Sequence, residues 1–369
     1  MELFGADLSA ASKRHSLSVA YVSLAVVPKD LTFAEGTTSI RVESALSRAT
    51  RWLIRGAPGS GKTTLVKWVA VTAARNGFRG SLDNWNGLIP FVVNLRQFAD
   101  TRLPLPEEFP RSSAPAIGSS APQGWVFSVL TSGRGLILVD GIDELPEGRR
   151  PDVLRWLRDL TGAFPTSVFI ISSRPHAVEE DWLAREHFTE ADLIEMRQAD
   201  ILTFIDHWHA AVAAELQDDE EKVALPDLAA SLKKVVLESR SIRHLTGSPL
   251  LCALVCALHR DRHRQIPKDR IELYEACCAM LLERRDAERH IQLGDYPLLT
   301  YRQKRVLLED LAYWMLRNGR AQANRSAVDS CFQTRLNGMR DVSPKLRGRP
   351  FASSSWNEVG CCRNPHSIL

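Results

Sequence analysis

The residues best suited to chemistry near the start of this chain form the run GAPGSGKT, residues 56–63. Gly56, Gly61, Lys62 and Thr63 fit the pattern G-x-x-x-x-G-K-[ST] of a phosphate-binding loop, the P-loop. Glycines allow a tight turn that aims backbone N–H groups at phosphate oxygens. We therefore expect Lys62 to reach the β- and γ-phosphates of a nucleotide and the Thr63 hydroxyl to bind Mg²⁺.

The elements around this run support the same interpretation. An apolar strand is predicted before the loop and an amphipathic helix after it, and the helix would add the positive end of its dipole. The residues predicted to contact the nucleotide are Gly56, Ala57, Pro58, Gly59, Ser60, Gly61, Lys62, Thr63 and Thr64.

Acidic residues follow a second apolar strand in the run GLILVDGIDEL, residues 135–145. Asp140 is predicted to lie at the carboxyl end of that strand, where open parallel sheets bind their ligands. There its carboxylate would hold Mg²⁺ opposite Thr63. Asp143 and Glu144 follow within one turn and are candidates to orient or deprotonate an attacking water.

A third apolar strand, in the run SVFIISSRP of residues 167–175, ends in Arg174. An arginine at this edge of the sheet would suit the γ-phosphate, because a guanidinium binds phosphate through two donors. The alternative is an ordinary surface arginine at a strand end. Pro175 is expected to end the strand.

The pattern of apolar residues predicts which elements position these side chains. Strands are expected at residues 52–54, 89–95, 135–139 and 168–172, and they are continuously apolar, as in parallel sheets covered on both faces. No strand is expected after Pro175. Residues 101–124, rich in Pro, Ser and Ala, are expected to be a surface insertion of low order.

Helical periodicity dominates the second half of the chain. The predicted helices are 199–216, 228–237, 249–260, 270–285 and 302–318, and the acidic run 218–221 is expected at a loop or helix end. The chain therefore divides into an α/β domain and a helical half.

Composition limits the function classes. The net charge is only +3 and no apolar run is long enough to span a membrane, so we expect a cytoplasmic protein with no clear nucleic-acid site and no membrane contact. The seven cysteines suggest no disulfide framework. Cys252, Cys256, His259 and His263 share a helix face but cannot converge on one metal ion, so core packing is favoured.

The three motifs together resemble those of the NACHT family of signal-transducing NTPases. The specific mark is DGIDE, with Asp140 followed by acids at 143 and 144. GSPLLCAL, residues 247–254, is similar to the family's helical motif, and the resemblance implies that Pro249 contacts adenine. Residues 266–286 and 304–320 resemble the family's helical and winged-helix segments.

The resemblance implies an α/β P-loop NTPase fold with a parallel sheet and flanking helices (AAA/STAND-like), followed by an all-α helical domain and a partial winged-helix region. The expected division is a lead-in segment (1–48, with a β-like run at 17–27 and a helical piece at 40–49), the NACHT nucleotide-binding domain (49–195), a helical domain (196–262), a partial winged-helix-like region (263–335) and an irregular tail (336–369).

The sequence also suggests a hypothesis for the origin of the irregular tail. One choice of codons for residues 352–365, read in another frame, spells FLLERSGLL, a phrase that resembles a NACHT winged-helix region. On this hypothesis the tail is the out-of-frame product of a frameshift.

The implied activity is that of an ATP/ADP switch with Mg²⁺ as cofactor and weak ATP hydrolysis. The family resemblance further implies self-oligomerisation on activation and a link to bacterial antiphage defence and NLR-like signalling, with effector and sensor modules expected to be missing from this chain. Two alternatives remain open at this stage. One is a P-loop kinase that phosphorylates a small substrate, and the other is a non-catalytic fragment that only binds nucleotide.

Overall fold

The structure is a computed structural model that describes residues 23–29, 39–261, 271–282 and 299–339. Within these ranges positions 100, 115, 117, 146, 176, 179–181, 215, 277, 280–281, 321–322 and 324 are left out. The chain divides into two compact units, Met1–Gln265 and Ile266–Leu369, and each is described by itself.

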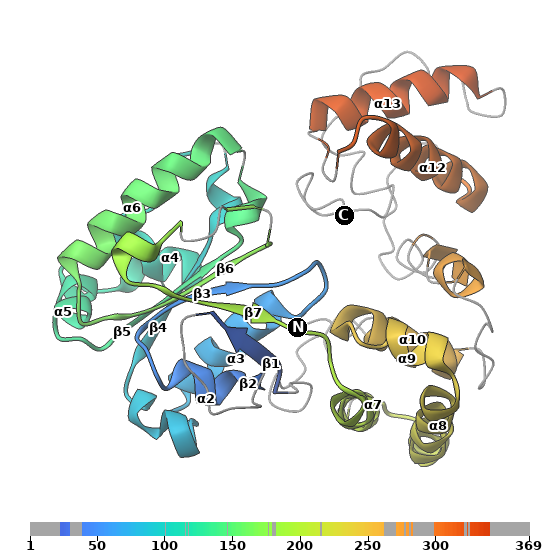
Figure 1. The fold of residues 1–369 in the computed structure, drawn as a ribbon, viewed down its shortest axis with the longest axis horizontal. Coiled ribbons are helices and arrows are strands. Elements are labelled where there is room, and N and C mark those ends of the chain that lie inside the picture. The colour runs from blue at the N-terminus through green and yellow to red at the C-terminus, as the bar shows by residue number, and fades with distance from the viewer. Residues whose placement is uncertain are drawn as a thin grey trace. The chain divides into compact units, whose positions relative to one another are not determined.

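The first unit is built on a sheet of seven strands (Figure 1). Its spatial order is β2-β1-β7-β3-β6-β5-β4. The strands are β1 (Ala25–Pro28), β2 (Ile40–Arg41), β3 (Arg51–Arg55), β4 (Ile89–Asn94), β5 (Gly135–Asp140), β6 (Val168–Ser173) and β7 (Thr189–Leu193). Strands β4, β5, β6, β3 and β7 run parallel, whereas β1 is antiparallel to β7 and β2 is antiparallel to β1.

The four strands predicted from apolar runs are all present, as β3, β4, β5 and β6. Every residue of β5 and β6 is buried, which explains why these strands are continuously apolar up to their polar last residues rather than apolar at alternate positions. The α/β fold class is therefore confirmed. Because the strands are parallel, the loops after β3, β5 and β6 all leave the sheet on the same side, at the carboxyl ends of the strands.

Helices cover both faces of the sheet. On one face the core contains α4 (Phe109–Ser113), α5 (Trp125–Thr131) and α6 (Arg150–Ala163), packed on residues such as Leu53, Ile137 and Phe169. On the other face α3 (Lys62–Ala74) packs against β4, β5 and β6, as Figure 1 shows. Short 3₁₀ helices are η1 (Gly80–Trp85), η2 (Leu95–Phe98), η3 (Pro106–Glu108), η4 (Gly118–Ser120), η5 (Ile142–Glu144), η6 (Glu147–Arg149) and η7 (Ala184–Glu186).

Two sequence-based expectations for this unit are wrong. Strands do not stop after Pro175, because β7 lies between β1 and β3; its buried Glu190 interrupts the apolar pattern that would have revealed it. Residues 101–124 are not an insertion of low order either, because they contain α4. Phe109 is fully buried in the core, and the Ser113 hydroxyl donates to the Val92 carbonyl and accepts from the Val92 N–H at 2.8 Å.

Part of the predicted lead-in joins the sheet. Strands β1 and β2 and helix α2 (Val42–Leu46) pair or pack with one another, and Ile194 N–H donates to the Ala25 carbonyl at 3.1 Å. An ion pair of 2.6 Å also joins Arg41 to Asp200 at the start of the helices that follow.

The described part of the first unit ends in four helices. They are α7 (Gln198–Ala213), α8 (Asp219–Glu238), α9 (Arg240–Leu245) and α10 (Pro249–Asp261). Helices α7, α8 and α10 pack on one another, and Cys252 and Cys256 are fully buried. Asp218 caps α8 by accepting from Glu220 N–H at 2.9 Å, so the acidic run is a helix start.

In the second unit, α12 (Tyr301–Arg317) and α13 (Arg325–Gly338) pack together around Leu311 and Phe332. These helices agree with an α-helical C-terminal part. The described residues of the predicted helix 270–285, namely 271–276, 278–279 and 282, are helical, whereas nearly the whole of the predicted tail lies outside the described residues. The winged-helix assignment and the frameshift hypothesis therefore stay predictions.

Candidate functional site

The loop 56–61 joins β3 to α3, in the order that the sequence predicts. Gly59 and Gly61 have φ angles of +75° and +95°, which favour glycine. A Cβ on Gly56 would lie 2.4 Å from the Ser60 hydroxyl oxygen. The loop thus folds back on itself too closely for a larger residue at Gly56, while Ala57, Pro58 and Thr63 are exposed.

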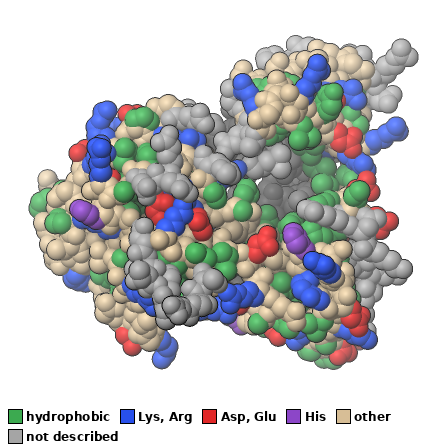
Figure 2. All heavy atoms as spheres, in the orientation of Figure 1, with side chains coloured by type: hydrophobic (Ala, Val, Ile, Leu, Met, Phe, Trp, Pro, Cys, Tyr) green, Lys and Arg blue, Asp and Glu red, His purple; other side chains and the backbone are tan. Residues whose placement is uncertain are grey.

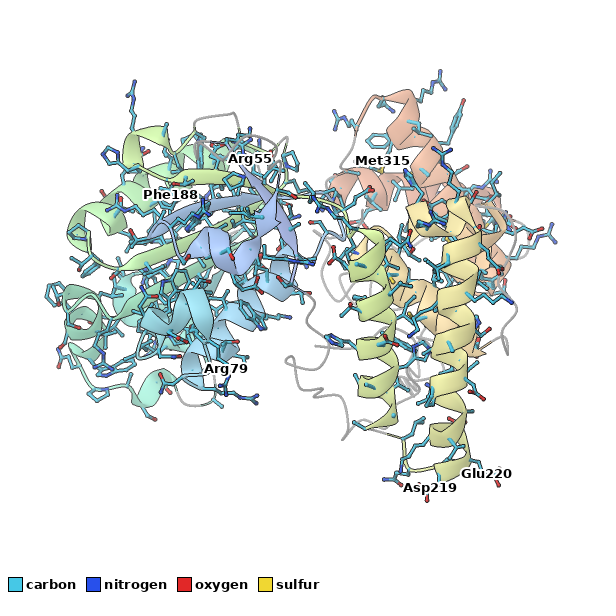
Figure 3. The ribbon with its side chains drawn as sticks, turned by 60° about the horizontal axis from the view of Figure 1, so that its bottom comes forward. Arg55, Arg79, Phe188, Asp219, Glu220 and Met315 are labelled. Carbon is cyan, nitrogen blue, oxygen red and sulfur yellow. The ribbon has the colours of Figure 1, made fainter. Side chains whose placement is uncertain are left out.

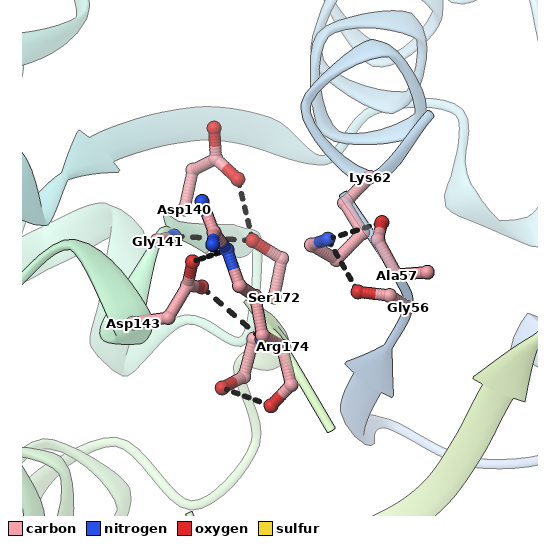
Figure 4. Close-up of polar contacts among 9 residues, drawn as sticks. Gly56, Ala57, Lys62, Asp140, Gly141, Asp143, Ser172 and Arg174 are labelled. Carbon is pink, nitrogen blue, oxygen red and sulfur yellow. Dashed lines mark hydrogen bonds and ion pairs between the residues drawn. The ribbon is translucent and has the colours of Figure 1, made fainter. Parts of the chain in front are cut away.

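Lys62, the first residue of α3, folds back over this loop (Figure 4). Its Nζ donates to the carbonyls of Gly56 at 2.6 Å and Ala57 at 3.1 Å. Burial lowers the pKa of Lys62, and the nearby carboxylates of Asp143, Asp140 and Glu144 act against that shift. The ammonium therefore lies within the electrostatic reach of the acidic loop after β5.

Asp140, at the carboxyl end of β5, is only 7% exposed. The Ser172 hydroxyl donates to its carboxylate and accepts from Gly141 N–H at 3.1 Å. Ser172 lies at the end of the neighbouring strand β6 and fixes the rotamer of Asp140. Sequence reasoning assigned Ser172 no role, although its place at the end of an apolar strand was a usable signal.

Asp143 and Arg174 form a second pair across the same two strands. Arg174 Nε lies 2.8 Å from Asp143 Oδ2, and the Arg174 N–H donates to Asp143 Oδ1 at 3.1 Å. Asp143 thus holds both the backbone and the side chain of the arginine. Figure 4 shows this pair beside Asp140 and Ser172 and across from Lys62.

Glu144 occupies a different environment. Burial raises the pKa of its carboxyl from 4.5 to about 7; Arg96 opposes this shift, and the negative charges of Asp140 and Asp143 add to it. Its side chain packs on the backbone of Gly141, whose φ is +84°, and an added Cβ there would meet Glu144 at 3.0 Å. Arg96, just after β4, is a member of this charged group that sequence reasoning missed.

The start of α10 contacts the P-loop directly. The Ser248 hydroxyl and the Leu250 N–H both donate to the Gly59 carbonyl, at 3.2 Å and 3.3 Å. A Cβ built on Gly61 would lie 3.7 Å from Cγ of Pro249, so this proline lies beside the loop. The structure therefore brings Pro249, predicted from the resemblance, next to the P-loop.

These residues fit a nucleotide with Mg²⁺. Gly59 and Gly61 allow the left-handed backbone of a phosphate-binding turn, and the Ser60 hydroxyl is buried without a hydrogen-bond partner among the described residues. The Thr63 hydroxyl and the Asp140 carboxylate are oxygen ligands of the kind that Mg²⁺ prefers. By contrast, no group of three or more His, Cys, Asp or Glu in the described part of the chain could hold a metal ion.

The fold and this arrangement define a nucleotide-binding P-loop NTPase module. Residues 50–212 match the family model described as "NACHT domain", in agreement with the family resemblance of the sequence motifs. The matched range runs from β3 into α7 and contains all the predicted site residues except Pro249.

Solved structures with a similar arrangement are distant. The ORC1 protein of Aeropyrum pernix in complex with DNA is 16% identical, over 86% of this chain and 80% of that chain, with a TM-score of 0.35. The Drosophila ORC bound to DNA is 14% identical, over 81% and 80% of the two chains, with a TM-score of 0.39. RuvB of Thermotoga maritima, a Holliday junction branch migration motor, is 12% identical, over 85% and 89%, with a TM-score of 0.32.

No curated protein matches the sequence. Within the described residues, no helix has the length and apolar character needed to cross a bilayer. On the face shown in Figure 2, the described Lys and Arg side chains are interspersed with Asp and Glu rather than gathered in one area.

Proposed function

We propose that this chain is a Mg-ATP-dependent switch of the NACHT type that hydrolyses ATP slowly. The observation that supports this most directly is the acidic and arginine group at the ends of β5 and β6, within electrostatic reach of Lys62. A loop that only held phosphate would have no need of such a group, whereas cleavage of the γ-phosphate requires charge compensation and a positioned water.

The binding roles follow from position. The backbone of residues 56–64 and the Lys62 ammonium would hold the phosphates, and Pro249 would contact the base. Thr63 and Asp140 would hold Mg²⁺, which supplies charge neutralisation at the phosphate oxygens. Ser172 would keep the Asp140 carboxylate in its ligating orientation through the hydroxyl contact.

The catalytic roles divide between the two acids after Asp140. Glu144, with its pKa near neutrality, is suited to accept a proton from the attacking water. Asp143 is engaged with Arg174, so its role would be to orient that arginine toward the γ-phosphate.

The switch would act through the contact between Gly59 and the start of α10. A nucleotide biases two packings only through its different affinity for each of them. A change of the P-loop on exchange of ADP for ATP would change the hydrogen bonds from Ser248 and Leu250 to Gly59. Self-oligomerisation and a signalling role in bacterial antiphage defence are the downstream functions that we propose for this module.

The test is nucleotide binding and phosphate release by the full chain and two variants. We expect Lys62→Ala and Asp140→Ala to lower Mg-ATP affinity or turnover at least about tenfold, because each removes a charge from the phosphate and metal site. Lys67→Ala is the matched control, because Lys67 is an exposed lysine of the same helix. Unchanged Mg-ATP binding and unchanged turnover in both site variants would contradict the assignment.

The same assay separates the alternatives. Phosphate release without an acceptor supports the switch, and transfer only to an added small hydroxyl compound would support a kinase. Binding that Lys62→Ala abolishes, with no release at any enzyme concentration, would support a non-catalytic nucleotide-binding module.

A further inference from the structure

Arg55 is the last residue of β3 and directly precedes the P-loop (labelled in Figure 3). Its side chain is only 3% exposed. A buried guanidinium is costly unless charge and hydrogen bonds compensate it, so the partners of this group define its role.

The guanidinium of Arg55 joins two segments that are distant in sequence. Nη1 donates to the carbonyls of Pro175 at 3.2 Å and Val178 at 3.1 Å. Nη2 donates to Oε1 of Glu190 at 3.0 Å, and Glu190 is itself buried in β7. Lys29 Nζ lies 3.8 Å from the other oxygen of Glu190.

The segment that Arg55 holds begins directly after Arg174. Ala177 N–H donates to the Arg174 carbonyl at 3.1 Å, which closes the turn between Arg174 and Val178. On the other side, Gly56 N–H donates to the Ser173 carbonyl at 3.1 Å. The backbone on both sides of Arg174 is thus tied to the start of the P-loop.

We propose that Arg55 is a positioning residue that sets the place of Arg174 relative to the nucleotide. It would do so by holding the turn 174–178 against the P-loop strand, with Glu190 compensating its charge. This inference rests on the proposed function, because it assigns Arg174 to the γ-phosphate.

The proposal distinguishes ATP from ADP. The P-loop backbone would bind the α- and β-phosphates of both nucleotides, whereas Arg174 would act only where a γ-phosphate is present. A displaced Arg174 should therefore reduce hydrolysis and the preference for ATP, while ADP binding stays close to that of the unaltered protein.

The main variant is Arg55→Lys, tested in the full chain. A lysine keeps the charge opposite Glu190 but lacks the planar fork that bonds the two carbonyls through Nη1 and Glu190 through Nη2. We expect kcat for ATP hydrolysis to fall about tenfold, affinity for a non-hydrolysable ATP analogue to fall about fivefold, and affinity for Mg-ADP to change less than about twofold.

Arg51→Lys is the matched control. Arg51 lies at the other end of the same strand and also donates to backbone carbonyls, of Glu186 at 2.7 Å and Thr161 at 3.3 Å. Because these contacts lie away from the P-loop, this variant should keep the ratio of ATP-analogue to ADP affinity. If Arg55→Lys acted only by loosening the sheet, Arg51→Lys would change the same ratio of affinities.

The deciding measurement repeats Arg55→Lys in an Arg174→Ala background. If Arg55 acts through Arg174, Arg55→Lys in this background should have the same analogue affinity and turnover as Arg174→Ala alone. If Arg55→Lys does not fold, the pair Arg55→Met with Glu190→Met removes the buried ion pair as a whole and is measured instead.

Two results would overturn the proposal. One is an equal loss of ADP and analogue affinity in Arg55→Lys, and the other is a full additional loss in the Arg174→Ala background. Failure of the proposed function would look different, because the unaltered chain would then bind no Mg-nucleotide, or would bind it without releasing phosphate.

Discussion

Asp143 and Glu144 are neighbours in sequence but occupy different environments. The carboxylate of Asp143 is compensated by Arg174 through two contacts. Glu144 is partly buried beside the charges of Asp140 and Asp143, and this burial is the main reason that its pKa is raised. Glu144 is therefore suited to accept a proton near neutral pH, whereas Asp143 is suited to hold Arg174 in place.

This difference predicts a pH-dependent effect of Glu144→Gln on stability. The folded protein binds the Glu144 proton more strongly than the unfolded chain, because the folded pKa is about 7 and the ordinary value is 4.5. The free energy of unfolding should therefore fall as pH rises from about 4.5 to about 7. Glu144→Gln removes this loss and should be more stable than the unaltered protein above pH 7, by up to about 3 kcal/mol, but not below pH 4.5.

The measurement is chemical denaturation across this pH range without nucleotide or Mg²⁺. Glu238→Gln, at an exposed position near the end of α8, is the control and should leave the profile unchanged. A stability difference between Glu144→Gln and the unaltered protein that is the same at pH 4 and pH 8 would contradict the environment assigned to Glu144.

At the scale of elements, a carbonyl of the P-loop accepts a hydrogen bond from a backbone N–H in the first turn of α10. The first N–H groups of a helix have no partner within the helix, and here the Leu250 N–H donates to Gly59 instead. The absence of a side chain at Gly59 is needed twice, for its φ of +75° and for the close approach of Leu250 and Ser248. The loop and the helix therefore constrain each other.

Gly59→Ala tests this double constraint against Gly80→Ala. Gly80 has a φ of +66° but open space around an added Cβ, so its substitution should cost about 1 kcal/mol from backbone strain alone. At Gly59 the Cβ would meet Leu250 Cβ at 3.0 Å, which should add about 1–3 kcal/mol. Thermal or chemical unfolding of both variants measures the difference, and equal losses would exclude a packing contribution from α10.

The sequence predicts a strand correctly where the residues of that strand alone show the apolar pattern. The runs that form β5 and β6 are continuously apolar up to their polar last residues because both faces of those strands are covered. The prediction failed at β7, because the buried Glu190 is compensated by Arg55, more than a hundred residues earlier. The contacts of Ser172 with Asp140 and of Ser248 with Gly59 likewise depend on folding that brings distant segments together.

At the scale of the whole molecule, the two units separate the nucleotide site from the C-terminal helices in sequence. The P-loop, the acidic group and α10 all lie within Met1–Gln265, whereas α12 and α13 have their own core around Leu311 and Phe332. Ligand binding should therefore act first on the stability of the first unit.

We expect Mg-ADP at about 100 times its dissociation constant to add about 2.7 kcal/mol to the unfolding free energy of the first unit. The same nucleotide should give no such gain in Lys62→Ala, and chelation of Mg²⁺ should reduce it. Calorimetry with and without nucleotide measures the shift. An equal shift in Lys62→Ala would show that the nucleotide binds elsewhere.

The edges of the sheet have a consequence for self-assembly. At one edge β2 is only two residues long. At the other, β4 contains Pro90, and the N–H and carbonyl of Val92 are both bonded to the Ser113 hydroxyl. Short strands, edge prolines and occupied backbone groups all oppose the addition of a foreign strand. Copies of this chain that associate should therefore do so through side-chain surfaces, and the sheet is protected against the edge-to-edge pairing that leads to aggregation.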